Sequence, residues 1–257
     1  MRGENRVVAG SLSSETGSKP RFRLLNLKNQ SPLSQAISTA VLLPPVLLGA
    51  YVFCGWLTRG PWLLSTFHFA WERRIPLVPW MIVPYLSLDA LLVTAIFLCR
   101  DAGELRRLVR SLLLATAIAG AIFVLWPMRM GFERVAPRGP MGFACAILWK
   151  MDRSYNRFPS LHVAIAVILW TVFARHTRGV VAALIHVWFA LVVVSTLLTW
   201  QHHVADVIAG AALGALVSIN PSRLCFSRKN NSSAPGPKSH STAVHPNATP
   251  VHVPRSQ

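Results

Sequence analysis

Long apolar stretches separated by short polar ones dominate the chain from residue 36 to residue 219. A helix that crosses the hydrocarbon core of a bilayer needs roughly 20 mainly apolar residues, and six stretches come near that length. No long alternation of apolar and polar residues competes with this pattern, so a membrane β-barrel is not favoured. The predicted spans are residues 36–58, 76–99, 108–128, 158–174, 179–199 and 203–219.

The fourth and sixth stretches are short and begin with polar residues, so we expect them to start at the membrane interface. Residues 1–35 are basic and polar and show no cleavage site after a short apolar core, so no removable signal peptide is expected. Residues 220–257 are rich in Ser, Pro, Asn, Lys and His, which predicts a disordered tail. The predicted architecture is an all-α polytopic six-helix membrane bundle, 36–219, between two polar ends.

The composition agrees with a membrane bundle and bears on how the high positive net charge is interpreted. Of the 257 residues, 53% are hydrophobic and only 14% are charged, too apolar a balance for an ordinary soluble domain. The net charge of +17 would suggest a nucleic-acid partner in a soluble protein. Here the basic residues flank the spans, where they meet anionic lipid headgroups, and no nucleic-acid module or aromatic platform is recognisable. We therefore expect the bilayer, and not nucleic acid, as partner.

The basic residues also predict an orientation. They precede the first span, lie between the second and third and between the fourth and fifth, and follow the sixth. By the positive-inside rule these segments and both termini are cytoplasmic, and the bacterial character of the sequence suggests the inner membrane. One basic segment, 129–157, which we expect to be a loop, falls outside by the same alternation. We interpret it as an anion-binding segment, because arginine presents paired donors that match phosphate oxygens. Its basic residues are Arg129, Arg134, Arg138, Lys150, Arg153 and Arg157.

The same alternation places the starts of the fourth and sixth spans outside, so "FPSLH", "QHHVAD" and the arginine segment share one membrane face. His202 and Asp206 are four residues apart and would lie on one face of a helix. A carboxylate there takes the proton of one imidazole nitrogen and leaves the other free as a nucleophile. His162 would act as general acid. The arginines and the first N–H groups of the fourth helix would stabilise phosphoryl oxygens.

Simpler interpretations exist for each of these residues alone. An interfacial histidine is commonly a boundary residue, and a His and an Asp one turn apart can be a structural pair. Their shared depth favours a functional site, because ionisable groups inside a membrane are functional candidates. The four cysteines lack metal-ligand spacing, so no metal site is expected.

"FPSLH" followed by "STLLTWQHHVADVIAG" resembles the second and third motifs of the type 2 phosphatidic acid phosphatase superfamily of membrane enzymes, over roughly residues 76–214. The resemblance implies a six-helix bundle and a reaction that passes through a phosphohistidine without a metal or other cofactor. It further implies that His202 is the nucleophile, Asp206 its orienting partner and His162 the acid. Ser160 would help to hold phosphate.

Two departures from the family pattern concern arginines. The third motif usually has Ser-Arg before the nucleophilic histidine, whereas Ser195 is followed here by Thr196. The first motif, a Lys followed after six residues by Arg-Pro, is matched only loosely, by Arg129 with Arg134 or with the Ala-Pro at 136–137. We expect Arg134 or Arg138 to supply the missing charge.

Another departure points to particular branches of the superfamily. Leu161 replaces the usual Gly of the second motif, and a polar residue and two histidines precede the Asp, as in branches that include inositol phosphorylceramide synthase. Three functions therefore stay open. The leading one is hydrolysis of a membrane lipid phosphate or pyrophosphate at the outer leaflet. The others are transfer of a phosphate-linked headgroup to a lipid alcohol, and a bundle without catalysis.

Overall fold

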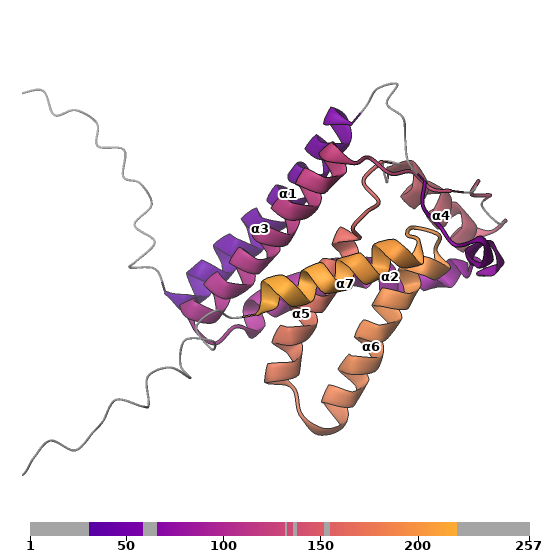
Figure 1. The fold of residues 1–257 in the computed structure, drawn as a ribbon. Coiled ribbons are helices and arrows are strands. Elements are labelled where there is room, and N and C mark those ends of the chain that lie inside the picture. The colour runs from indigo at the N-terminus through magenta and orange to yellow at the C-terminus, as the bar shows by residue number, and fades with distance from the viewer. Residues whose placement is uncertain (1–30, 59–65, 132, 136–137, 152–154, 220–257) are drawn as a thin grey trace, which may run out of the picture. The chain divides into compact units, whose positions relative to one another are not determined.

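The computed structural model describes residues 31–58, 66–131, 133–135, 138–151 and 155–219. In these residues every regular element is helical (Figure 1). Most of the predicted N-terminal segment and of the predicted tail lies outside the described residues. The elements are α1 (Pro32–Leu57), η2 (Ala70–Arg74), η3 (Pro79–Met81), α2 (Ile82–Leu98), α3 (Ala102–Leu125), α4 (Pro140–Met151), α5 (Leu161–His176), α6 (Gly179–Leu198) and α7 (Val204–Ser218).

Four of these helical stretches are long and apolar enough to cross a membrane: α1, η3 with α2, α3 and α6. α5 and α7 are apolar too, but have only 16 and 15 residues. Many large apolar side chains on the helices are exposed, among them Leu42, Val181 and Leu184. Lipid tails are as apolar as these side chains, so such a surface suits a bilayer. The prediction of an all-helical membrane protein is confirmed, and each predicted span corresponds to one helix.

The observed helix limits differ from the predicted ones where polar residues form the first turn. The Ser31 hydroxyl caps α1, which begins at Pro32 and not at residue 36. The Asp101 carboxylate accepts the backbone N–H of Glu104 at 2.8 Å, so α3 begins well before residue 108. Capping oxygens satisfy the first N–H groups of a helix, and a search for apolar residues alone does not find them.

The basic segment 129–157, expected as a loop, contains the helix α4. Gly139, at φ +99°, leads into Pro140, and proline fits the first position of a helix. The Phe143 N–H then bonds the Gly139 carbonyl at 3.0 Å. Apolar residues follow up to Trp149, and these stabilise the helix against η3 and α2. The loop prediction was wrong for this part because it followed the charges and not the apolar residues between them.

α5 is the central helix, in contact with α2, α3, α6 and α7, while α1 lies alongside α3 (Figure 1). Two glycines let α7 approach α5 closely. A Cβ on Gly210 would overlap the backbone of Ser160, and one on Gly214 would meet the Ala164 carbonyl at 2.6 Å. Small residues at four-residue spacing permit such contact between membrane helices. The first turns of α5 and α7 are thereby held against each other.

Candidate active site

Three segments that are distant in sequence meet at the N-terminal ends of α5 and α7. The Ser160 N–H donates to the Asp206 carbonyl at 3.0 Å, which joins the starts of the two helices. The Gly131 N–H donates to His203 Nε2 at 3.0 Å, which joins the arginine segment to the start of α7. The structure therefore brings together the three polar clusters that the sequence places on one membrane face.

The end of α6 delivers His202 to this junction. The N–H groups of Gln201 and His202 both donate to the Thr196 carbonyl, at 2.9 and 3.1 Å, and Trp200 adopts a left-handed backbone with φ 53°. This pattern is the Schellman ending of a helix, in which the left-handed position is usually Gly. Thr196 is fully buried, and its hydroxyl bonds the Val193 carbonyl. The residue in the place of the motif arginine thus holds His202 through its backbone.

A left-handed backbone conformation costs a residue other than Gly about 1–2 kcal/mol. At Trp200 this conformation is stabilised by contacts of the side chain and of the carbonyl. Its indole N–H donates to the Ile75 carbonyl at 3.1 Å, and its ring stacks on Trp149 with centroids 6.4 Å apart. The Arg134 guanidinium lies 5.3 Å from the centre of the Trp149 ring and donates to the Trp200 carbonyl at 3.5 Å. Arg134, one of the predicted phosphate-binding arginines, therefore contacts Trp200, two residues before His202 in the sequence.

His202 lies outside the helix from which its pairing was predicted, because α7 begins only at Val204. The helical-face argument is therefore wrong, yet the two side chains still meet: His202 Nδ1 is 3.5 Å from Asp206 Oδ2. The same carboxylate oxygen accepts the His203 N–H at 2.9 Å. A separation of 3.5 Å is long for a hydrogen bond, as is common for catalytic pairs without substrate.

His162 occupies the first turn of α5. Its ring stacks on Tyr85, with centroids 4.0 Å apart and planes 9° from parallel. Its Nε2 atom is buried without a hydrogen bond to any described residue. Two residues earlier, the Ser160 N–H bonds the Asp206 carbonyl, so the first turn of α5 that carries His162 lies against the start of α7. A buried nitrogen without a partner is costly, so it is typical of a group that meets a ligand.

Ser160 and Arg157 complete the polar lining. The Ser160 hydroxyl oxygen accepts the Val163 N–H at 3.3 Å and so caps α5, while its hydrogen can still be donated. Arg157 is 1% exposed and donates to the Gln201 carbonyl. A buried guanidinium beside the N-terminus of a helix concentrates positive charge in one place. Sequence reasoning counted Arg157 among the basic residues but did not propose it as a ligand. Its position directly before "FPSLH" was the signal.

The two other predicted arginines have exposed side chains. Arg129 and Arg138 are exposed, and neither makes a hydrogen bond or ion pair with a described residue. Their role in binding phosphate stays a prediction. Arg153 and the Ala-Pro alternative of the first motif, residues 136–137, lie outside the described part of the chain.

Glu72 is a component that sequence reasoning missed. It belongs to η2 and is 1% exposed, with Oε2 2.7 Å from His203 Nδ1. Burial lowers the pKa of His203 despite the nearby carboxylates of Glu72 and Asp206. Nothing in "FHFAWERR" signals this pairing, because the partner lies 131 residues further along.

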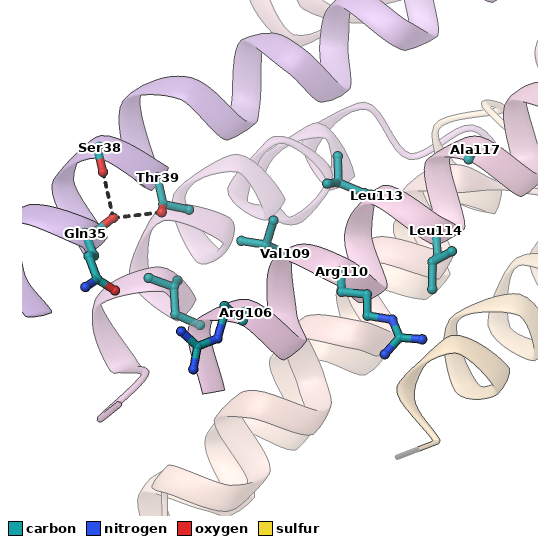
Figure 2. Close-up of a pocket in the computed structure, with 10 residues that line it drawn as sticks. Gln35, Ser38, Thr39, Arg106, Val109, Arg110, Leu113, Leu114 and Ala117 are labelled. Atoms are coloured by element: carbon teal, nitrogen blue, oxygen red, sulfur yellow. Dashed lines mark hydrogen bonds between the residues drawn. The ribbon is translucent and has the colours of Figure 1, made fainter. Parts of the chain in front are cut away.

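A groove of about 710 Å³ lies between α1 and α3, and no predicted site residue lines it (Figure 2). The groove is polar at one end, with two arginines, and apolar at the other. The residues that line the groove are Gln35, Ser38, Thr39, Leu105, Arg106, Val109, Arg110, Leu113, Leu114 and Ala117.

No group of three or more His, Cys, Asp or Glu side chains in the described residues is placed to hold a metal ion.

Comparison with protein families gives one match. A family model described as PAP2 superfamily matches residues 52–219, about two thirds of the chain and all of the junction described above. Comparison with curated proteins and with solved structures finds no match.

Proposed function

The chain belongs to the PAP2 superfamily, and from that premise we propose that it is an integral membrane phosphatase that hydrolyses a lipid phosphate or pyrophosphate. Membership supports phosphatase chemistry in general. One observation carries the proposal further. The buried Nε2 of His162 lies in the first turn of α5, whose Ser160 cap bonds the carbonyl of Asp206, the partner of His202. An anion bound there would be met by helix N–H groups and by two imidazoles.

The first step is attack on phosphorus. When substrate binds, Asp206 accepts the Nδ1 proton of His202, 3.5 Å away in the structure, and the lone pair of Nε2 forms the bond to phosphorus. The bond between phosphorus and the lipid oxygen breaks, and His162 gives its proton to that oxygen. The products of this step are a phosphohistidine and a lipid alcohol, or a lipid monophosphate when the substrate is a pyrophosphate.

The second step returns the enzyme to its starting state. His162, now neutral, takes a proton from water as the water oxygen attacks the phosphohistidine. The bond between phosphorus and Nε2 of His202 breaks, which releases inorganic phosphate. His162 is protonated again and His202 is a nucleophile again, so atoms and charges balance without a cofactor.

Arg157 takes the part of the arginine that the third motif lacks. Its guanidinium contacts the Gln201 carbonyl, one residue before the nucleophile, and it precedes the Ser160 cap by three positions. Catalysis of phosphoryl transfer is mainly positioning and stabilisation of charge, and a planar fork of donors suits the equatorial oxygens. Arg134, held by Trp149 and Trp200, is the second candidate for this role.

Orientation and location follow from charge. The positive-inside rule places both termini in the cytoplasm and the histidines at the outer face of the membrane, where a lipid phosphate of the outer leaflet meets them. For a bacterial chain this is the inner membrane. The substrate is expected to be a membrane lipid, because the site lies at the ends of helices that are apolar along their length.

The test uses purified full-length protein in lipid vesicles. Phosphate release and lipid products are followed by mass spectrometry with phosphatidic acid, phosphatidylglycerol phosphate and a polyprenyl pyrophosphate as substrates. His202→Gln removes the nucleophile at nearly constant volume, and His186→Gln, in α6, is the matched control. We expect release from at least one lipid, a loss of at least about 10³-fold for His202→Gln, and little change for the control.

Other outcomes would replace the proposal. A new lipid, formed only when a donor and an acceptor lipid are mixed, would identify a phosphotransferase. Release that is equal in wild type and His202→Gln would show that another group reacts. Absence of both signals across the lipid panel would identify a bundle without catalysis.

A further inference from the structure

A buried Glu–His pair adjoins the two histidines of the proposed reaction. Glu72 and His203 are 1% and 2% exposed, and their side chains meet at 2.7 Å. Glu72 also accepts the N–H groups of Phe69 at 3.0 Å and of Val204 at 3.3 Å. Acidic side chains are almost never fully buried unless they are paired, and here every described contact of the carboxylate is a hydrogen-bond donor. The pair thus fastens η2 to the start of α7.

The second nitrogen of His203 settles which tautomer is present. Nε2 accepts the Gly131 N–H at 3.0 Å, so this nitrogen carries a lone pair and the ring proton lies on Nδ1, facing Glu72. The His68 ring stacks on His203 with centroids 5.1 Å apart. Gly131 is tightly confined there, because a Cβ on it would overlap the His68 ring. Only the neutral imidazole can join all these groups.

His203 is also tied to the reacting pair through its backbone. Its N–H donates to Asp206 Oδ2 at 2.9 Å, the same oxygen that lies 3.5 Å from His202 Nδ1. On the other side, Gly131 is three residues before Arg134, which contacts the carbonyl of Trp200. His203 therefore stands between the arginine segment and the nucleophile.

We propose that Glu72 and His203 are positioning residues, which fix Gly131 and Asp206 around His202, and that a proton on His203 Nε2 releases the Gly131 segment. A protonated Nε2 is a donor, and it would face another donor, the Gly131 N–H. The titratable groups that face His203 are Glu72 from η2, His68 from the segment before it and Asp206 from α7. The positioning role rests on the proposed phosphatase function only in the test that measures kcat; the test by hydrogen exchange does not depend on it.

The direct test is hydrogen exchange of peptides that contain Gly131, expressed as protection factors between pH 8 and pH 5. We expect protection in the wild type to fall at least about 10-fold on acidification, and in His203→Gln to be independent of pH, because the amide does not titrate. Glu72→Gln removes a carboxylate that favours the protonated imidazole, so its loss of protection should shift to lower pH by roughly one unit or more.

The chain offers a matched control at another place. His176 and Glu104 form a second His–Glu pair, Nε2 to Oε2 3.2 Å, which joins α5 to α3. His176→Gln should leave the protection of Gly131 and its pH dependence unchanged. A wild-type profile that is flat with pH, or an equal effect of His176→Gln, would overturn the proposal even if His203 variants fold poorly.

Activity supplies the second readout. The acid limb of kcat should shift with the same variants and in the same direction as the protection of Gly131. If the wild type hydrolyses no lipid but the protection behaves as expected, the proposed function fails and the positioning role stands. If hydrolysis depends on His202 while the protection of Gly131 ignores pH and Glu72, the positioning role fails.

Discussion

At the scale of single residues, the candidate site lacks the arginine of the third family motif and contains another buried arginine instead. Thr196 stands where the family motif has an arginine, is fully buried, and contributes its carbonyl to the turn before His202. The buried guanidinium comes instead from Arg157, on the segment that leads into α5. In the proposed mechanism, positive charge is thus supplied from the residue directly before the second motif and not from the third motif.

Replacing Arg157 tests this exchange. We expect Arg157→Ala to lower kcat about 10²–10³-fold, and Arg157→Lys to recover only part of it, because an ammonium lacks the planar fork that matches phosphate oxygens. Inhibition by vanadate, which mimics the phosphoryl group, should weaken in parallel. The exposed Arg175→Ala, in the last turn of α5 and so at the end away from His162, is the control and should change kcat by less than about 3-fold. Unchanged kcat in folded Arg157→Ala would return the role to Arg134.

The acid dependence of stability follows from His203. The pKa of His203 is lowered in the folded protein by burial, so just below the ordinary histidine pKa the unfolded chain binds a proton at this residue more readily than the folded chain does. The stability that depends on the neutral ring is present above the ordinary histidine pKa of about 6.5 and is lost as the pH falls below it. We expect the Tm of the wild type to drop between pH 7 and pH 5. In His203→Gln this drop should be smaller, which thermal unfolding in detergent measures directly.

At the scale of elements, the packing of α5 on α7 sets the site. Gly210 lets the Ser160 carbonyl approach α7, and Ser160 in turn bonds the Asp206 carbonyl. The obstacle to a larger residue at 210 is backbone, which moves less readily than the end of a side chain. The two motif segments are therefore held by helix packing and not only by their own side chains.

Gly210→Ala should separate these two helices. Overpacking costs about 1–3 kcal/mol, so we expect a lower Tm together with a lower kcat, as the Ser160 cap moves away from Asp206. Gly49→Ala in α1 has open space around the new methyl and should keep or raise the Tm, since Ala favours helix. A Gly210→Ala variant with unchanged Tm and kcat would contradict the close-packing argument.

Apolar patterning predicted the six helices well and their ends less well. The limits of α1 and α3 depend on Ser31 and Asp101, whose oxygens cap the first turns, and α4 was hidden among basic residues. The segments that hold His162 and His202 were predictable because each motif is local. The Glu72–His203 pair was not, because it depends on how distant segments pack.

At the scale of the whole molecule, labelling of the arginine segment tests the predicted orientation. Membrane-impermeant maleimide applied from outside should label Arg138→Cys, in a variant without the four native cysteines, while Arg106→Cys in α3 should react only after the cells are opened. A reporter fused after Gln257 should be active in the cytoplasm. Labelling of residue 138 only from inside would invert the assignment and place the histidines at the cytoplasmic face.

The lengths of α5 and α7 bear on how substrate arrives. With 16 and 15 residues they extend about 24 and 22 Å, less than the roughly 30 Å of a bilayer core. Both begin beside His162 and His202, so, with their other ends at the cytoplasmic interface as proposed, the two histidines would lie within the outer leaflet and not beyond it. In the proposed function, a lipid phosphate would then arrive by lateral diffusion while its acyl chains stay among their neighbours. The turnover rate per enzyme should depend on the mole fraction of substrate in the membrane. Diluting the vesicle suspension with buffer, which lowers only the bulk concentration of substrate, should not slow it.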